Sequence, residues 1–126
     1  MPRTTESLEM YLENILVLEN TKEKVRSIDV AHRTGYSKPS VSRAMKLLVS
    51  DFCIEIDGDG HITLTDKGRE IATKIFERHK VISEFFMSIG VSEENATEDA
   101  CRIEHVISDE SLEAIKNHAC EMMKKQ

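Results

Sequence analysis

The fold is decided by the stretch VRSIDVAHRTGYSKPSVSRAMKLLVSDF, residues 25–52. Ser27 can cap a short helix that runs to about Thr34, because its hydroxyl oxygen can accept a hydrogen bond from an N–H of the first turn. Gly35 supplies a residue that tolerates a positive φ at the helix end. Ser37 is placed to cap a second helix. Two short helices joined by a turn of three or four residues predict a helix-turn-helix.

The second helix of this motif has two chemically different faces. Apolar side chains recur at helical spacing and predict a buried stripe, made of Val41, Ala44, Leu47 and Leu48. The other face carries polar and basic side chains, namely Lys38, Ser40, Ser42, Arg43 and Lys46. A charged helix face taken alone is usually only solvated, but the second helix of a helix-turn-helix is the one that enters the major groove. A DNA-reading surface is therefore the better interpretation.

We expect the start of this helix and its basic face to contact double-stranded DNA. Lys38 suits a phosphate or a guanine, and Arg43, one turn further along, can form a bidentate pair with guanine. Serine hydroxyls can donate to phosphate oxygens, and Pro39 and Ser40 offer apolar contacts to thymine methyl groups. The predicted DNA-binding residues are Ser37, Lys38, Pro39, Ser40, Ser42, Arg43 and Lys46.

The flanking segments extend the helix-turn-helix into a winged helix. Residues 4–22, TTESLEMYLENILVLENTK, carry apolar residues at helical spacing and predict a first helix. After Phe52 the apolar period changes to two. Residues 53–57 and 61–65, CIEID and HITLT, alternate around GDG, which predicts a β-hairpin. Helix, helix-turn-helix and hairpin in this order form a winged helix.

The second half of the chain is predicted to be helical. A long helix opens at Thr65 and runs to about Ser88. Ser92 can cap the next helix, which is expected to end near Ser108, and a last helix follows. The predicted fold class is mainly α, with an N-terminal winged helix-turn-helix followed by an all-helical second part.

Charge is segregated along the chain. The 126 residues have a net charge of −6, which argues against a protein held on DNA by overall charge alone. Residues 22–47 nevertheless have a local balance of +5, whereas residues 83–113 have a local balance of −8. A basic segment suits phosphates, and an acidic segment that contains His and Cys suits a cation. We expect the two halves to have different roles.

Composition narrows the location and the kind of chemistry. The sequence contains no apolar run of about 18 residues and no secretory leader, so we expect a cytoplasmic protein without a membrane partner. Three widely spaced cysteines indicate free thiols rather than a disulfide framework. Motifs such as HExxH are absent from the sequence, so we expect neither an enzyme nor a small organic substrate.

Potential metal ligands stand together in EDACRIEHVISDE, residues 98–110. Cys101, Glu104 and His105 occupy relative positions 0, 3 and 4, which share one face if the segment is an α-helix. Each residue alone has an ordinary structural role, but burying a thiol, a carboxylate and an imidazole together is costly without a cation. The spacing therefore predicts a metal site.

Five motifs together resemble the diphtheria-toxin-repressor family of metal-dependent transcriptional regulators, the iron- and manganese-dependent repressors. These motifs are TTESLEMYL, KPSVSRAMKLL, LTDKGREIA, RHKVISEFF and EDACRIEHVISDE. The resemblance implies a winged helix-turn-helix DNA-binding domain over residues 1–70 and a helical dimerisation and metal-binding domain over residues 71–126. The resemblance also implies that a divalent metal bound between these two domains enables the dimer to bind its operator. The chain is expected to lack the SH3-like third domain.

The resemblance also implies a ligand set. In the iron-responsive branch the primary ligands correspond to Met10, Cys101, Glu104 and His105. The manganese-responsive branch has Asp and Glu at the first two of these positions, and it adds ligands that correspond to Glu13 and His79. The ancillary site of the iron branch is expected to be incomplete, because Ser83 and Thr97 replace a Glu and a His.

The homodimer follows from DNA reading. One helix-turn-helix reads only a few base pairs, so specificity requires two half-sites related by a dimer axis and a pseudo-palindromic operator. The predicted dimer surface is apolar and contains Phe85, Phe86, Met87, Val106, Ile107, Leu112 and Ile115.

Ligand softness favours iron as the signal. A thioether and a thiolate favour Fe(II), Co(II), Ni(II) or Zn(II) over Mn(II), which prefers oxygen ligands. Together with the family resemblance, this softness implies an Fe(II)-dependent repressor of metal uptake or homeostasis genes that can also bind Co(II), Ni(II) or Zn(II) in vitro. Two alternatives stay open, a Mn(II)-responsive repressor of the same family and a winged-helix regulator that senses a non-metal ligand.

Overall fold

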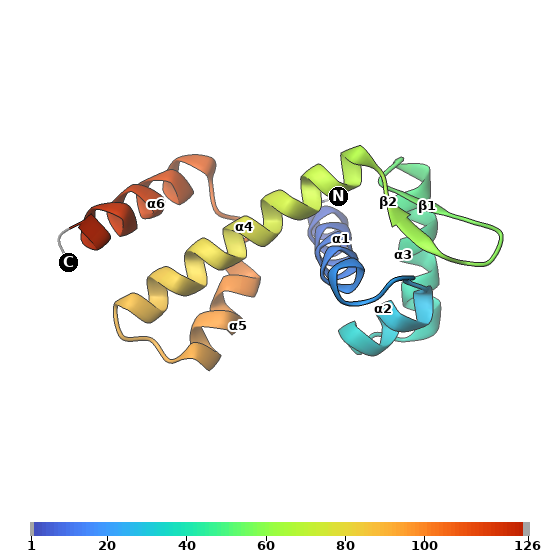
Figure 1. Cartoon of the computed structure of the whole chain (residues 1–126), viewed down its shortest axis with the longest axis horizontal. Coiled ribbons are helices and arrows are strands. Elements are labelled where there is room, and N and C mark those ends of the chain that lie inside the picture. Colours follow the sequence, from blue (N-terminus) through green and yellow to red (C-terminus); the bar gives the residue numbers. More distant parts are fainter. Residues whose placement is uncertain (1, 125–126) are drawn as a thin grey trace. The chain divides into compact units, whose positions relative to one another are not determined.

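Six helices and one two-stranded sheet make up the described part of the chain (Figure 1). The computed structural model describes the backbone of residues 2–124 and the side chains of residues 6–119 and 121. The elements are α1 (Pro2–Thr21), α2 (Ser27–Thr34), α3 (Lys38–Ser50), β1 (Ile54–Ile56), β2 (Ile62–Leu64), α4 (Asp66–Ser88), α5 (Glu93–Ile103) and α6 (Asp109–Lys124). The chain divides into two compact units, Met1–Thr73 and Lys74–Gln126. The predicted mainly α fold class is confirmed.

Helices α2 and α3 form the predicted helix-turn-helix. Gly35 ends α2 with a φ of 77°, and its N–H donates to the carbonyl of Ala31 at 2.9 Å. This left-handed conformation favours glycine because a Cβ would be strained there. Ser37 caps α3, because its hydroxyl oxygen accepts a hydrogen bond from the N–H of Ser40 at 3.3 Å. Both local predictions are confirmed.

The start of α2 differs from the sequence prediction. Ser27 is the first helical residue rather than the cap, and Arg26 occupies the cap position. The carboxylate of Asp29 accepts the N–H of Arg26 at 2.9 Å and also pairs with Lys22. The pKa of Asp29 is held below its usual value mainly by the hydrogen bond from Lys22 and, to a smaller extent, by the hydrogen bond from Arg26. A carboxylate that reaches back three residues therefore satisfies the helix start in place of a serine hydroxyl.

The core of the first unit is enclosed by its helices and the hairpin. Helix α1 contacts α2, α3 and β2, and α3 contacts β1. Apolar side chains at helical spacing on α1 and α3 meet side chains from α2 and β1, and the most buried include Leu12, Ile15, Val30, Val41, Met45, Leu48 and Ile54. Burial of these side chains supplies the main stabilisation of the unit.

One residue of the predicted stripe on α3 is not buried. Leu47 is 48% exposed, whereas Met45 is 2% exposed. Counted from Val41, the helix positions i+3, i+4 and i+7 face the same side, and these are Ala44, Met45 and Leu48. The helical period therefore selects Met45 for the core, and the prediction for Leu47 was wrong.

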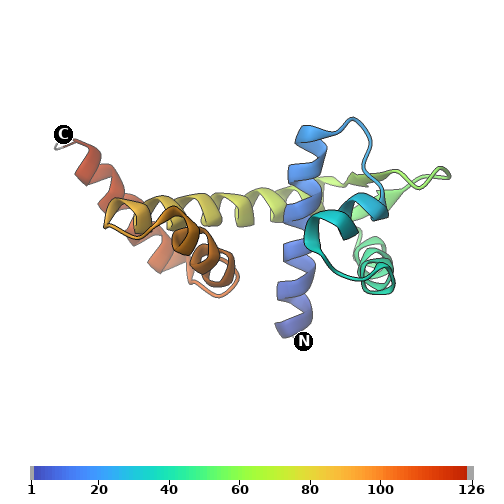
Figure 2. The ribbon, with the colours of Figure 1, turned by 90° about the horizontal axis from the view of Figure 1, so that it is seen from below.

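The hairpin after α3 forms the predicted wing. Strands β1 and β2 are antiparallel, with Ile54 opposite Leu64 and Ile56 opposite Ile62. The N–H of Ile62 also donates to the carbonyl of Val25 at 2.7 Å, which adds a bridge from the segment before α2. The loop of the hairpin extends away from the helices of its own unit (Figure 2).

Helix α4 begins close to the end of α3. The hydroxyl of Thr65 accepts the N–H of Gly68 at 3.1 Å and donates to the carbonyl of Phe52 at 2.6 Å, as expected for a helix start. A Cβ on Gly68 would lie 1.9 Å from the carbonyl oxygen of Cys53. This close approach of α4 to the chain after α3 therefore requires glycine.

The second unit packs the end of α4, α5 and α6 around a small apolar core, whose buried residues include Ile82, Ala100 and Leu112. Ser92 caps α5 as predicted, because its hydroxyl accepts the N–H of Asn95 at 3.3 Å. Helix α5 ends at Ile103 rather than near Ser108, so that boundary was predicted wrongly. Within the part of the chain that the structure describes, none of the helices combines the length and apolarity needed to cross a membrane.

Candidate metal centre and DNA-reading face

A buried carboxylate lies between two imidazole rings in the second unit. Glu104 is 1% exposed. Its Oε2 lies 2.9 Å from Nδ1 of His79, and its Oε1 lies 3.3 Å from Nε2 of His105. A carboxylate at this depth requires donors or cations around it, because burying an unpaired charge is costly. The three side chains offer oxygen and nitrogen atoms of the kinds that bind metal ions.

The thiol of Cys101 extends this set. Its Sγ lies 3.8 Å from Nδ1 of His79. Metal–nitrogen bonds of about 2.1 Å and metal–sulfur bonds of about 2.3 Å place two ligands of one ion roughly 3 to 4 Å apart. Thiolate, imidazole and carboxylate are all ligands of divalent transition metals. We call His79, Cys101, Glu104 and His105 the donor cluster, and its chemistry fits such an ion.

The end of α5 shapes the donor cluster. Cys101 lies in the last turn of α5, and Glu104 follows the helix with near-helical dihedral angles, φ −57° and ψ −26°. The N–H of Glu104 still donates to the carbonyl of Ala100 at 2.9 Å. His105 lies in the turn beyond the helix. The predicted helix therefore continues as far as Ile103, and the turn brings His105 beside the carboxylate.

His79 reaches the donor cluster from α4, 22 residues before Cys101. No spacing in the sequence indicated this contact, although the family resemblance had indicated His79 as a ligand. The preceding residue, Arg78, was not predicted at all. It donates to the carbonyl of Glu104 at 3.2 Å and to the carboxylate of Asp109. Its position next to His79 is the sequence signal that could have found it.

Met10 and Glu13 lie on α1 in the first unit, whereas the donor cluster lies in the second. Both residues are half-buried. Met10 packs against the apolar core of its own unit, and its carbonyl accepts a hydrogen bond from the side chain of Asn14 at 2.8 Å. Glu13 follows three residues later and so shares a helix face with Met10.

The predicted DNA-reading face lies on α3, and its exposed side chains are those of Ser37, Lys38, Pro39, Ser42, Arg43 and Lys46. Ser40 is half-buried, and its Oγ lies 2.9 Å from Oγ of Ser37 and 3.4 Å from Nη2 of Arg43. The cap of α3 and the guanidinium of Arg43 are therefore joined by hydrogen bonds. This arrangement orients Arg43 while leaving it exposed.

Tyr36, in the turn before α3, was also missed by the sequence analysis. Its exposed ring lies 5.9 Å from the ring of the buried Tyr11, centroid to centroid. Burial is the main cause that raises the pKa of Tyr11. An exposed phenol at the start of a recognition helix can donate to a phosphate. An aromatic residue directly before the Ser37 cap is the signal that could have indicated it.

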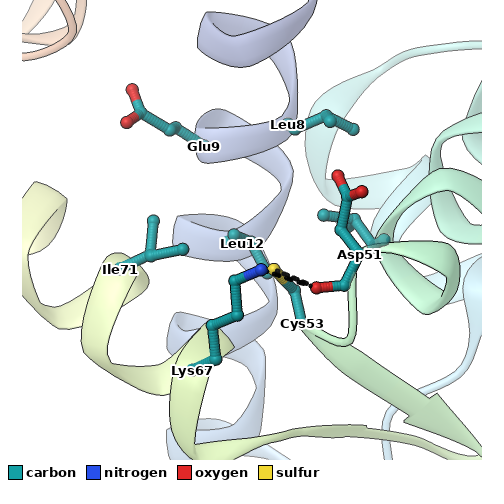
Figure 3. A pocket seen from close by; sticks show the side chains of 8 residues that line it. Leu8, Glu9, Leu12, Asp51, Cys53, Lys67 and Ile71 are labelled. Carbon is teal, nitrogen blue, oxygen red and sulfur yellow. Dashed lines mark hydrogen bonds between the residues drawn. The ribbon is translucent and has the colours of Figure 1, made fainter.

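A small pocket lies within the first unit (Figure 3). Its volume is about 200 Å³, and its lining includes Leu12, Asp51, Cys53 and Lys67. The ammonium of Lys67 donates to the carbonyl of Asp51 at 2.9 Å, and the thiol of Cys53 lies 3.7 Å from the same oxygen. Burial raises the pKa of Cys53, which keeps the thiol protonated. Pockets for organic ligands usually measure about 300–1,000 Å³, so this pocket is small for an organic effector.

The winged helix of the first unit and the donor cluster of the second define a class of protein, in which a DNA-binding domain is joined to a helical metal-binding domain. Two family profiles make the assignment specific. "Iron dependent repressor, N-terminal DNA binding domain" matches residues 3–62, and "Iron dependent repressor, metal binding and dimerisation domain" matches residues 65–123. The chain belongs to this iron-dependent repressor family, that of the diphtheria toxin repressor, which confirms the resemblance seen in its motifs.

Relatives named for two different metals match the chain. The transcriptional regulator MntR of Escherichia coli O157:H7 is 34% identical over 111 residues, which cover 88% of this chain and 72% of MntR. The iron-dependent repressor IdeR of Mycobacterium tuberculosis is 32% identical over 111 residues, 87% of this chain and 48% of IdeR. The structure of the manganese regulator SloR has a TM-score of 0.80 at 27% identity, and the match covers 89% of this chain and 53% of SloR. The chain thus spans about half the length of IdeR and SloR.

Proposed function

We propose that the chain is an Fe(II)-dependent transcriptional repressor that acts in the cytoplasm. As a metal-loaded homodimer it binds a pseudo-palindromic DNA operator and controls genes of metal uptake or homeostasis. The observation that carries the proposal is the donor cluster, in which the buried Glu104 lies within 3.3 Å of His79 and His105. Membership of the iron-dependent repressor family supports it. The proposal assigns no catalytic step to any residue.

The proposed primary ligands are Met10, Cys101, Glu104 and His105, and Glu13 and His79 are proposed as further ligands. Two of the primary ligands carry sulfur, which favours Fe(II) over the oxygen-preferring Mn(II). Co(II), Ni(II) and Zn(II) are expected to bind in vitro for the same reason. The thioether of Met10 is a soft ligand without charge, so it favours Fe(II) without adding to the negative charge of the site.

The mechanism depends on ligands from both units. A bound divalent ion would supply the charge that joins them. Met10 and Glu13 belong to the DNA-reading unit, whereas the donor cluster belongs to the helical unit. Ligation from both units would restrict the distance between the two DNA-reading units of a dimer. The entropic cost of ordering these units would then fall on metal binding and no longer on DNA binding.

The homodimer is proposed to form through the second unit. Val106 is 67% exposed and Met87 is also exposed, and both are apolar side chains that gain by leaving water. Leu112, which was expected on this surface, is instead buried in the core of its own unit. Its packing against α4 and α5 removes it from the proposed interface.

Metal-titrated DNA binding under anaerobic conditions tests the function. The probe is a duplex that the Fe(II)-loaded chain selects from a random pool. Fe(II) is expected to promote binding more strongly than Mn(II) at equal free concentration, and a chelator should abolish it. A stronger effect of Mn(II) would overturn the iron assignment. DNA binding that is unchanged by either metal and by the chelator would overturn the metal-dependent mechanism.

Manganese is the second candidate because His79 contacts Glu104 at 2.9 Å and Glu13 is present on α1. Both positions correspond to ligands of the manganese-responsive branch. The double substitution Met10→Asp with Cys101→Glu should therefore shift the metal preference toward Mn(II), because it replaces soft sulfur with oxygen. An unchanged preference would show that selectivity lies in other residues.

A further inference from the structure

Arg78 directly precedes His79 on α4 but is not a member of the donor cluster. Its side chain is 12% exposed. Nη1 donates to the carbonyl oxygens of Glu104 and Ile107 at 3.2 Å each, and Nη2 donates to the carboxylate of Asp109. All three acceptors lie in or beside the turn that joins α5 to α6.

These contacts act on the turn that carries two proposed ligands. In an uninterrupted α-helix the carbonyl of Glu104 would accept the N–H of Ser108. Here it accepts a hydrogen bond from Arg78. The carboxylate of the same Glu104 is held by His79 at 2.9 Å. Two consecutive residues of α4 thus hold the backbone and the side chain of one proposed ligand.

The geometry requires arginine in particular. A guanidinium presents five N–H donors in a rigid plane, whereas a lysine ammonium is a point charge that cannot span the same acceptors. The carboxylate of Asp109 offsets the positive charge, which would otherwise oppose a nearby cation. Nε of Arg78 is buried and has no hydrogen-bond partner among the described residues, and this desolvation costs stability. The hydrogen bonds of the two Nη atoms therefore hold the side chain in place despite the cost of burying Nε.

We propose that Arg78 is a positioning residue of the metal centre. By holding the turn that contains Glu104 and His105, it places both ligands without touching the ion. The inference rests on the proposed function, because it requires a metal at the donor cluster. Residues that support metal ligands from outside typically change affinity about 10–100-fold when they are lost, and we expect a loss of this size for Arg78.

Co(II) titration of the purified, reduced full chain tests this role, because absorption reports both affinity and ligand arrangement. Arg78→Met keeps the apolar stem and removes every donor, so it should bind Co(II) about 10–100-fold more weakly and show an altered spectrum at saturation. Arg78→Lys should recover part of the affinity. Lys74→Met is the matched control, because Lys74 pairs with the same Asp109 at 3.7 Å. It should keep the affinity and spectrum of the unchanged chain.

A second variant keeps the test decisive if Arg78→Met does not fold. Asp109 has a side chain that is 72% exposed, so Asp109→Asn removes one anchor of Arg78 without opening a cavity. It should weaken Co(II) binding in the same direction by a smaller factor. The positioning role would be overturned if Asp109→Asn and Arg78→Lys both kept the Co(II) affinity and spectrum of the unchanged chain, together with Arg78→Met where that variant folds. The proposed function would then remain intact. An unchanged chain that binds no Co(II) would overturn both.

Discussion

At the scale of single residues, the carboxylate of Glu104 is costly to bury, and the groups that offset this cost are also the groups of the proposed metal site. A buried carboxylate destabilises a fold unless donors surround it. The imidazoles of His79 and His105 lie 2.9 and 3.3 Å from its oxygens and can serve as such donors when protonated at the facing nitrogen. A divalent cation would offset the same negative charge. Burial of this carboxylate therefore favours a cation at this position.

Gly68→Ala should destabilise the first unit by roughly 1–3 kcal/mol, as expected for overpacking. The added Cβ would lie 1.9 Å from the carbonyl oxygen of Cys53, and this outweighs the better helix propensity of alanine. Urea unfolding measures the change. Gly58→Ala is the control, because its Cβ would meet nothing within 4 Å. Equal stability of the two variants would contradict the close approach.

Asp29 should make stability depend on pH in the acidic range. Its pKa is lowered by the hydrogen bond from Lys22 and then by that from Arg26, so its contribution is complete above the unfolded value of about 3.9 and is lost as pH falls through the lower folded value. Asp29→Asn should cost about 1 kcal/mol or less near neutral pH, and this cost should vanish in strong acid. Asp59→Asn, in the exposed hairpin loop, serves as the control in denaturant titrations. A cost that persists unchanged in acid would contradict the ionic origin.

At the scale of elements, α3 buries one side in the core while its other side carries the predicted DNA-reading face. The buried side contains Val41, Ala44, Met45 and Leu48. The exposed side carries Arg43, which Ser40 orients at 3.4 Å. Because the two sides are rigidly related along one helix, core packing fixes the direction in which the basic side chains point. Stability and DNA reading can therefore be separated by substitution.

Met45→Ala and Leu47→Ala test this separation on α3. Met45 is 2% exposed, so its truncation leaves a cavity and should cost about 2–5 kcal/mol. Leu47 is 48% exposed, so its truncation should cost well under half of that. Thermal or urea unfolding compares the two variants directly. A larger loss for Leu47→Ala would mean that the stripe first predicted from the sequence is the buried one.

At the scale of the whole molecule, the proposed function couples DNA binding by the first unit to metal binding by ligands from both units. Binding free energies couple reciprocally, so operator DNA should tighten metal binding by the same factor by which metal tightens DNA binding. The segregation of charge suits this division, because residues 22–47 are basic and residues 83–113 are acidic. The basic segment suits a DNA phosphate, and the acidic segment suits a cation.

Met10→Ala should weaken the coupling while sparing the apo dimer and its salt-sensitive, nonspecific DNA binding. The reason is that Met10 is the primary ligand proposed from the DNA-reading unit. Operator affinity with and without metal measures the coupling. Arg43→Ala is the opposite control, which should keep metal binding and cost roughly 1–3 kcal/mol at the operator. Unchanged metal-dependent operator binding in Met10→Ala would contradict ligation from both units.

The sequence by itself determined the features that depend on residues close together in the chain. Gly35 and Ser37 define the turn of the helix-turn-helix because a left-handed glycine and a serine cap act within four residues. The change of period to two after Phe52 likewise predicted the hairpin. Motif spacing also indicated Cys101, Glu104 and His105, whose donor atoms lie in or beside the last turn of α5.

Tertiary structure decided what depends on residues far apart in the chain. Helix α5 ends at Ile103 where Arg78, from α4, hydrogen-bonds the carbonyls of the following turn and competes with further helical bonds. His79 joins Cys101 and Glu104 only because α4 and α5 pack side by side. Spacing along the chain carries no information on such contacts, since they depend on how whole helices bury their apolar faces. Spacing could therefore indicate the proposed ligands that are nearest to one another in sequence, whereas it could not indicate the side chains that surround and hold them.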